Sequence, residues 1–131
     1  MASVFTKIAR GEIPAHRIAE DPAHLAFLDA NPLVKGHTLV VPKREVDYYF
    51  DLEDEELAAL NAFAKRVARA VYREVPCLRI GMAVVGLEVP HVHLHLVPLN
   101  RMADIDFGKE RVSFTTEEFA ATAARIRRVF L

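Results

Sequence analysis

Apolar side chains recur at helical spacing in three stretches of the chain, and each stretch is predicted to be a helix. The longest runs from Glu53 to Val75, with acidic residues at its start, basic residues in its second half and Pro76 at its end. Its apolar stripe consists of Leu57, Leu60, Phe63, Ala64, Val67 and Val71. A short helix is expected over Val4–Arg10, and a last one over Glu117–Phe130 behind the capping box Thr115-Thr116-Glu117-Glu118.

Five shorter stretches are rich in apolar residues, alternate in part, and end near Gly, Pro or Asp, which predicts strands. They are Arg17–Glu20, Leu25–Asp29, His37–Val41, Leu78–Val85 and His91–Leu99. A loop over Asp29–Gly36, a helical turn over Glu45–Phe50, a tight connection over Gly86–Pro90 and an irregular arm over Asn100–Val112 separate them. The pattern predicts one α+β domain over residues 1–131. We expect a mostly antiparallel sheet of about five strands with the long helix on one face and a C-terminal helix.

Composition agrees with a compact domain and excludes some classes of function. The 131 residues are 52% hydrophobic and 27% charged, and the formal net charge is −1. We therefore expect no general nucleic-acid or membrane-surface partner. No apolar run approaches the roughly 20 residues that span a bilayer, and no secretory signal pattern precedes the first helix. The single cysteine, Cys77, permits a reducing compartment, so we expect a cytoplasmic protein.

Three of the six histidines alternate with apolar residues in the last predicted strand, at His91, His93 and His95. Because alternate residues of a strand share a face, we expect these rings on one surface and Val92, Leu94 and Leu96 in the core. A solvated edge strand is disfavoured, since such faces usually carry Lys, Glu and Thr. Imidazole binds metals and acts as a base or nucleophile near neutral pH, so the histidines indicate a site.

A metal site and a catalytic site are both compatible with this alternation. Neighbouring members are about 6.6 Å apart along a strand and the outer two about 13 Å, so only two of them reach one ion. A metal would need a third ligand from elsewhere, with His37 the best candidate. The catalytic interpretation makes His93 a nucleophile toward phosphorus, because neutral imidazole forms covalent phospho-histidine intermediates.

His91-Val92-His93-Leu94-His95-Leu96-Val97 resembles the signature of the histidine-triad (HIT) family. Phe5-Thr6-Lys7-Ile8 and Gly11-Glu12-Ile13-Pro14-Ala15 resemble the N-terminal block of that family. Ala26-Phe27-Leu28-Asp29, Asn31-Pro32 and the run from Gly36 to Lys43 resemble its second block. The match covers about Val4 to Pro98. The resemblance implies a HIT-like fold and a homodimer that pairs through the long helix and a sheet strand.

The resemblance also implies roles for individual residues. His93 would attack the α-phosphorus of a nucleoside phosphoramidate, mixed anhydride or dinucleoside polyphosphate, and water would resolve the nucleotidyl-His93 intermediate. His95 would donate to a phosphate oxygen, His91 and its backbone would orient His93, and His37 would support the cluster. The loop that contains Asp29 would hold the ribose, and Phe5, Ile8 and Phe27 would clamp a purine. The scheme needs no cofactor and no protein-bound metal.

The segment before the triad departs from the pattern of the better-known members. They carry an Asn, a longer Gly-rich loop and a Gln-Ser or Gln-Thr pair, and the hydroxyl assists the leaving group. Here Gly86 stands near the place of the Asn, and Leu87-Glu88 replace the pair. Glu88 is assigned to the nucleotide site as a substitute acid, a contact for an amine leaving group, or a turn residue. The alternatives are a non-catalytic module that binds purine nucleotides, and a metal-binding protein that uses His91, His93 and His37.

Overall fold

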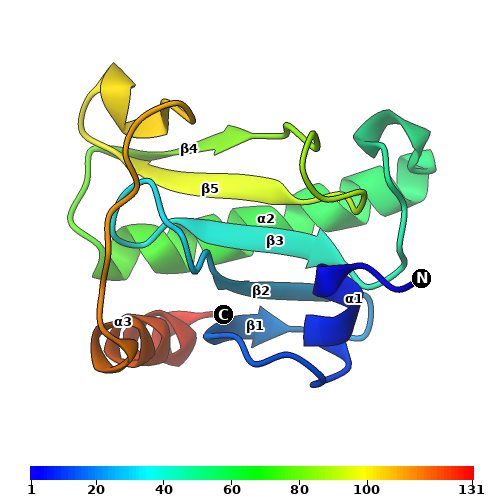
Figure 1. Cartoon of the computed structure of the whole chain (residues 1–131), viewed down its shortest axis with the longest axis horizontal. Coiled ribbons are helices and arrows are strands. Elements are labelled where there is room, and N and C mark those ends of the chain that lie inside the picture. Colours follow the sequence, from blue (N-terminus) through cyan, green and yellow to red (C-terminus); the bar gives the residue numbers. More distant parts are fainter.

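The computed structural model describes residues 1–131 and contains one five-stranded sheet (Figure 1). The strands are β1 (Arg17–Glu20), β2 (His24–Leu28), β3 (Thr38–Pro42), β4 (Arg79–Ala83) and β5 (Leu94–Leu99). Their order across the sheet is β1-β2-β3-β5-β4, and every neighbouring pair is antiparallel. The predicted α+β architecture is confirmed.

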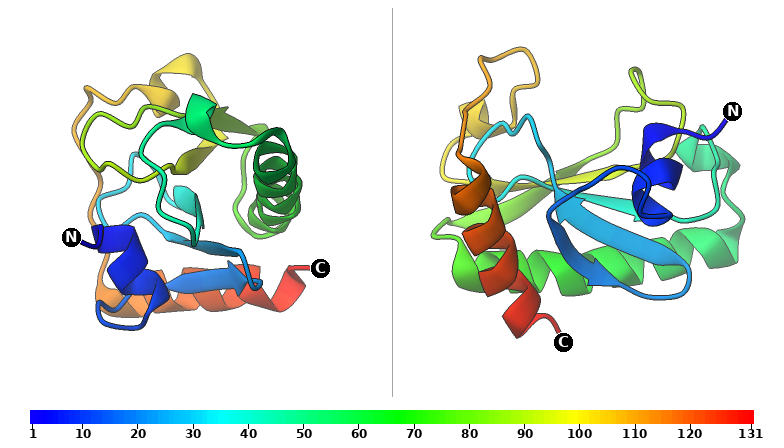
Figure 2. Two further views of the ribbon diagram at one scale, coloured as in Figure 1. Left: turned by 90° about the vertical axis from the view of Figure 1, so that its right-hand side faces the viewer. Right: turned by 60° about the horizontal axis from the view of Figure 1, so that its bottom comes forward.

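The strands send alternate side chains to two separate cores. One core lies under α2 (Asp54–Glu74) and α3 (Thr116–Val129), and the other lies under α1 (Val4–Ala9). Figure 2 shows α2 along one face of the sheet and α1 on the other side. The α2 core contains Ala26, Val40 and Leu94, among others, and the α1 core consists of Phe5, Ile8, Leu25, Phe27, Leu39 and Val41.

The sheet register aligns a row of side chains on the face opposite α2. Phe27 of β2 pairs with Leu39 of β3, and Leu39 pairs with His95 of β5. Because paired residues point to the same face, His95 stands beside the apolar surface that α1 covers. The register therefore places an imidazole next to an apolar floor.

The helices begin and end within one residue of their predicted limits. In α2 the predicted stripe is mostly buried, and Leu60, Phe63 and Val67 are at most 2% exposed. The capping box before α3 is confirmed, because the Thr115 hydroxyl accepts from the Glu118 backbone and the Glu118 carboxylate accepts from the Thr115 backbone. None of the helices combines the length with the apolar character that a membrane-spanning segment requires.

The last strand is shorter than predicted, and the connection before it is longer. Strand β5 begins at Leu94, so His91–Val92–His93 precede it, and residues 84–93 replace the predicted tight connection over Gly86–Pro90. The reason is pairing, because the ladders with β3 and β4 end at Leu94 and His95. Upstream, the Val92 N–H donates to the Val46 carbonyl instead. The predicted burial of Val92, Leu94 and Leu96 is nevertheless confirmed.

Two other segments also differ from expectation. The helical turn expected over Glu45–Phe50 occurs as the 3-10 turn η1 (Tyr49–Asp51), and the irregular arm contains the 3-10 turn η2 (Met102–Ile105).

Gly36, just before His37, has a φ of +87°, and a Cβ there would lie 2.8 Å from Val75 Cγ2. Only glycine fits this turn, which brings the chain tightly into β3.

Candidate functional site

A cavity of about 400 Å³ opens on the sheet face opposite α2, and two of the three alternating histidines line it. We call it the histidine cavity. His93 and His95 contribute imidazoles, Asp29 and Glu88 contribute carboxylates, and Arg111 is the only Lys or Arg side chain. The remaining lining residues are Phe5, Asn31, Leu39, Val85, Gly86, Leu87, Val89 and Phe107.

In its neutral form, His93 presents a ring nitrogen without a proton to this cavity. Its Nδ1 lies 2.7 Å from the His91 carbonyl oxygen, which can only accept, so Nδ1 carries the proton. Neutral imidazole then has a lone pair at Nε2, which has no protein partner. Since every buried polar side-chain atom has a hydrogen-bond partner, this free nitrogen is accessible from the cavity. A lone pair held in this way is a nucleophile.

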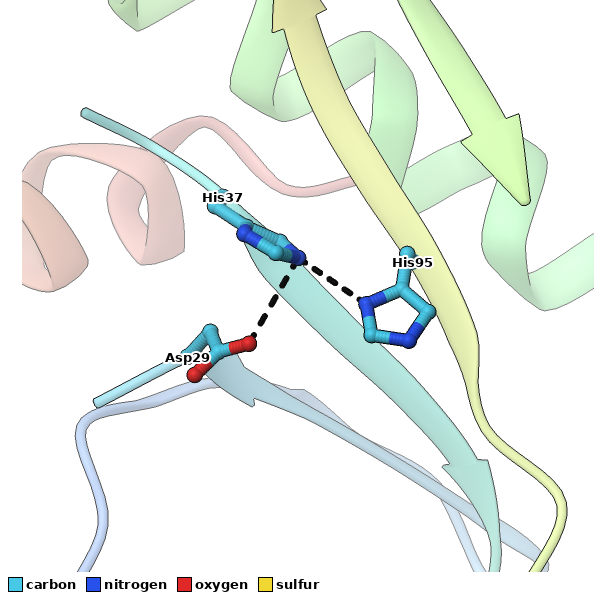
Figure 3. A group of neighbouring side chains, drawn as sticks. All are labelled: Asp29, His37 and His95. Atoms are coloured by element: carbon cyan, nitrogen blue, oxygen red, sulfur yellow. Dashed lines mark hydrogen bonds and ion pairs between the residues drawn. The ribbon is translucent and has the colours of Figure 1, made fainter. Parts of the chain in front are cut away.

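Neutral His95 carries its proton on Nε2, whereas His93 carries it on Nδ1, because a chain of hydrogen bonds fixes the tautomer of His95. The Leu33 backbone N–H donates to His37 Nδ1 at 3.0 Å, so the proton of neutral His37 sits on Nε2. That nitrogen lies 3.0 Å from His95 Nδ1, which accepts (Figure 3). The proton of His95 is therefore on Nε2. The site pairs an acceptor nitrogen on His93 with a donor nitrogen on His95.

Burial keeps the His37–His95 pair neutral at pH 7. Burial is the main cause that lowers the pKa of His37 to about 3, followed by the charges of His95 and Arg111. Burial also lowers the pKa of His95 to about 4, assisted by His93 and Arg111. The ring of Phe107 contributes to this burial, since its centroid lies 4.7 Å from that of His95. His95 can therefore donate one hydrogen bond while the pair stays uncharged.

Asp29 stands beside this pair, at the rim of the cavity. Its Oδ2 lies 3.5 Å from His37 Nε2 (Figure 3), and its Oδ1 accepts from the Asn31 backbone N–H. Burial raises the pKa of Asp29 above its ordinary value, although the Asn31 bond and Arg111 oppose the rise. The ligand atoms of Asp29, His37 and His95 lie within 4.8 Å of one another, so these three could also hold a metal ion.

His91 lies on the same side of the sheet as His93, because Phe5 contacts both rings, but it does not line the cavity. It is fully buried, its Nε2–H donates to the Pro42 carbonyl at 2.7 Å, and its Nδ1 lies 2.6 Å from the Ser3 hydroxyl. The three imidazoles all point away from the α2 core that contains Val92, Leu94 and Leu96, as expected, but the segment before β5 leaves the ladder and buries His91 outside the cavity. The residues that converge as possible metal ligands therefore differ from the expected set of His91, His93 and His37.

The apolar part of the cavity uses only one of the three expected aromatic and aliphatic residues. Phe5 lines it and stands edge-on to His93, with centroids 4.8 Å apart. Ile8 and Phe27 do not line it, because they pack behind Phe5 in the α1 core. Leu39, Val85, Leu87 and Val89 supply apolar surface that sequence patterns did not single out.

Glu88 lines the cavity with an exposed side chain that makes no hydrogen bond. It is the only titratable residue of segment 85–89, which offers no hydroxyl or side-chain amide. No capping or turn-forming contact of its carboxylate is present. Glu88 is thus available to a ligand.

The sequence pattern predicted an irregular arm over Asn100–Val112, but it assigned no role in the site to residues 106–112. Phe107 covers His95, and Arg111 donates to the Asn31 carbonyl at 2.8 Å. The Val112 N–H donates to the Pro32 carbonyl, which ties the arm to the loop that carries Asp29. This segment lacks periodicity, so only its position in the fold reveals that it closes one side of the cavity.

Comparison with known proteins gives consistent matches over most of the chain. The sequence model of the HIT domain family matches residues 10–102. The adenosine 5'-monophosphoramidase hnt1 of Schizosaccharomyces pombe is 34% identical over 128 residues, which is 96% of each chain. A HIT-like protein from Bartonella henselae superposes with a TM-score of 0.81 at 31% identity, over 96% of this chain and 95% of that one. A zinc-bound histidine triad family protein from Mycobacterium smegmatis superposes with a TM-score of 0.81 at 31% identity, over 98% of this chain and 96% of that one.

Proposed function

The chain belongs to the HIT family, and we propose that it is a nucleotide hydrolase or transferase that acts through a nucleotidyl-His93 intermediate. The observation that carries this proposal is the pair of fixed tautomers. His93 Nδ1–H is held by the His91 carbonyl, which leaves Nε2 as a nucleophile, and His95 Nε2–H stands beside it as a donor. The similarity to a phosphoramidase supports the same reaction class.

The proposed reaction has two displacements at the α-phosphorus. The His93 Nε2 lone pair forms a nitrogen–phosphorus bond while the bond from phosphorus to the leaving group breaks, and the leaving group takes that electron pair. Water then attacks the same phosphorus and releases a proton to solvent, while the nitrogen–phosphorus bond breaks and its electron pair returns to His93 Nε2. His95 Nε2–H donates to a non-bridging phosphate oxygen in both steps, where negative charge accumulates. An acceptor alcohol or amine in place of water would give transfer.

We assign the nucleoside to the two ends of the cavity by their chemistry. A purine has apolar faces, so it fits beside Phe5 and Leu39, while Ile8 and Phe27 support Phe5 from behind. Ribose hydroxyls donate well to a carboxylate, so Asp29 is the proposed ribose contact. Asp29 and Phe5 line one cavity with His93, which keeps base, sugar and α-phosphate within one ligand.

The leaving group is proposed to be weakly basic and anionic, as in a mixed anhydride or polyphosphate. Segment 85–89 offers only the Glu88 carboxylate as a possible acid, and Arg111 is the one fixed positive charge that lines the cavity. An arginine with one of its five N–H groups bonded to Asn31 has donors left for a phosphate. Amine leaving groups, which need protonation, are expected to react more slowly.

The proposed reaction uses no protein-bound metal. A metal at Asp29, His37 and His95 would have to replace the proton on His37 Nε2. That proton would move to Nδ1, where the Leu33 N–H already points, and two donors would face each other. The hydrogen-bonded arrangement avoids this conflict, and it favours catalysis over metal storage.

The working form is proposed to be a homodimer that pairs through α2 and β4. A groove of about 650 Å³ runs between them, and Tyr72 and Leu78 beside it are 53% and 71% exposed. Strand β4 is also a free edge, because its only neighbour is β5. Light scattering of the purified protein should give twice the mass of the chain. A monomer at high concentration would contradict this.

Turnover distinguishes this enzyme from a module that only binds nucleotides. Wild-type protein should hydrolyse a dinucleoside polyphosphate or an AMP-type mixed anhydride. His93→Ala should lose several orders of magnitude in kcat, because a covalent nucleophile is removed. AMP binding should persist in both proteins, since His93 is one of many contacts. AMP binding without any turnover by wild type would favour the non-catalytic module.

A further inference from the structure

Three polar side chains from two distant segments meet around the ring of His91. Ser3 and Thr6 belong to the first turn of α1, and Glu45 lies in the connection after β3. Ser3 Oγ lies 2.6 Å from His91 Nδ1, and Thr6 Oγ1 lies 2.6 Å from Glu45 Oε1. Neither these three side chains nor His91 lines the histidine cavity, so a bound nucleotide has no direct contact with them.

The direction of each hydrogen bond in this group is determined. Glu45 Oε1 accepts from the Ser3 backbone N–H at 2.7 Å and from the Thr6 hydroxyl. Thr6 has then used its only proton, so it cannot donate to His91 Nδ1, which lies 3.4 Å away. His91 Nε2–H donates to the Pro42 carbonyl, so Nδ1 must accept, and Ser3 Oγ–H is the donor. The Ser3 oxygen accepts the Thr6 N–H as the N-cap of α1.

These bonds leave no freedom for the ring of His91. The side chain is fully buried, and both ring nitrogens are bonded to groups of fixed polarity. A rotated ring would place Nε2–H against the Ser3 donor, and burial makes such a mismatch costly. The Val92 N–H is also held, by the carbonyl of Val46, which follows Glu45. The backbone between His91 and Val92 is therefore anchored from two sides.

The anchored backbone is the one that holds His93. The carbonyl of His91 accepts from His93 Nδ1–H at 2.7 Å and so directs Nε2 toward the cavity. Phe5, in the same turn of α1 as Thr6, packs edge-on against both His91 and His93. Helix α1 thus touches the nucleophile with one residue and fixes its backbone acceptor with two others.

We propose that Ser3, Thr6 and Glu45 form a clamp on His91 that positions the nucleophile His93. They are positioning residues, because they act through the His91 ring and carbonyl rather than on the substrate. The inference rests on the proposed role of His93, and it goes beyond that role by making the N-terminal turn part of the catalytic apparatus. A merely structural role would affect folding and leave the orientation and tautomer of His93 unchanged.

The test compares Ser3→Ala with Ser3→Thr, which restores the hydroxyl. Ser3→Ala should lower kcat by about 10- to 100-fold, because a small misplacement of a reacting group costs this much. Its KM should stay within about twofold, since no substrate contact is lost. Ser3→Thr should return kcat to within about threefold of wild type. Thr115→Ala is the matched control, because Thr115 caps α3 as Ser3 caps α1 and lies outside the cavity.

Imidazole nitrogen NMR provides a readout that does not depend on turnover. In wild type, the spectra should place the proton of His91 on Nε2 and that of His93 on Nδ1. In Ser3→Ala, His91 should keep its proton on Nε2, because the Pro42 carbonyl still accepts it, but the loosened ring should let His93 populate both tautomers. Thr115→Ala should resemble wild type. Unchanged tautomers and an unchanged kcat in Ser3→Ala would overturn the clamp. If wild type turned over no nucleotide, the proposed function would fail, while these spectra would still decide whether the clamp exists.

A second pair of variants tests the clamp if Ser3→Ala does not fold. Glu45→Gln keeps an acceptor oxygen for the Ser3 N–H and the Thr6 hydroxyl, whereas Glu45→Ala removes it. Glu45→Ala should reproduce the loss of kcat and the mixed His93 tautomers, and Glu45→Gln should remain near wild type. Equal kcat values and equal spectra for the two variants would contradict the proposal.

Discussion

Lowering the pH from 7 to 5 should destabilise the folded protein by about 4 kcal/mol through two buried imidazoles. The folded pKa values are about 3 for His37 and about 4 for His95, below the unfolded value of 6.5. Between pH 6.5 and 4 the unfolded chain therefore binds protons that the folded chain does not bind. The stability that these groups provide is complete above pH 6.5 and is lost as the pH falls through that window.

The magnitude follows from the width of that window. Each histidine costs about 1.36 kcal/mol per pH unit once its unfolded form is protonated, which gives about 2 kcal/mol at pH 5. Burial also lowers the pKa of His91, which adds to the loss of stability at low pH. The raised pKa of Asp29 reduces that loss, because the folded protein binds this proton more readily than the unfolded chain does. Glu45 has a pKa of about 2 in the folded protein, so it changes the pH dependence of stability only below its unfolded pKa of 4.5. The two histidines of the pair thus dominate between pH 7 and 5.

Urea unfolding at pH 8, 7, 6 and 5 measures this effect. His37→Asn keeps an acceptor for the Leu33 N–H and removes one titrating group, so its loss between pH 7 and 5 should fall to about 2 kcal/mol. Both proteins should change by less than about 0.5 kcal/mol between pH 8 and 7. Equal pH dependence in the two proteins, or a flat profile in wild type, would show that these two imidazoles do not control stability in this range.

Three further predictions concern catalysis. Activity should survive treatment with a chelator, and a stoichiometric zinc whose removal abolishes turnover would contradict the proposal. Across leaving groups of graded basicity, kcat/KM should fall steeply by about 10²- to 10⁴-fold, because segment 85–89 offers no established acid. A flat profile that becomes steep in Glu88→Gln would identify Glu88 as that acid. Arg111→Gln should lower kcat/KM about 10-fold or more for polyphosphates, and much less for substrates with uncharged leaving groups.

The fold was largely predictable because it rests on local periodicity. The apolar stripe of α2 and the Thr115 capping box are contained in short windows of sequence, and both are confirmed. The alternation of the histidines correctly predicted burial of Val92 and Leu94 but not the start of β5. Where a ladder ends depends on the partner strands, and their lengths are not encoded in the strand itself.

The candidate site was only partly predictable for the same reason. His93, His95, His37 and Asp29 came from motifs, and the structure brings them together. Their protonation depends on partners that carry no sequence signal of their own. The Leu33 N–H and the His91 carbonyl are backbone groups, and Ser3 is 88 residues from His91. The cytoplasmic location expected from the single Cys77 stays a prediction.

Rapid mixing with a nucleotide substrate, acid quenching and mass spectrometry of the digested protein would detect the nucleotidyl-His93 intermediate itself. The peptide that contains His93 should carry one nucleotidyl group on an imidazole nitrogen, and it should form at least as fast as steady-state turnover. The adduct should be absent from His93→Ala. Turnover by wild type with no adduct, or full activity in His93→Ala, would contradict covalent catalysis by His93.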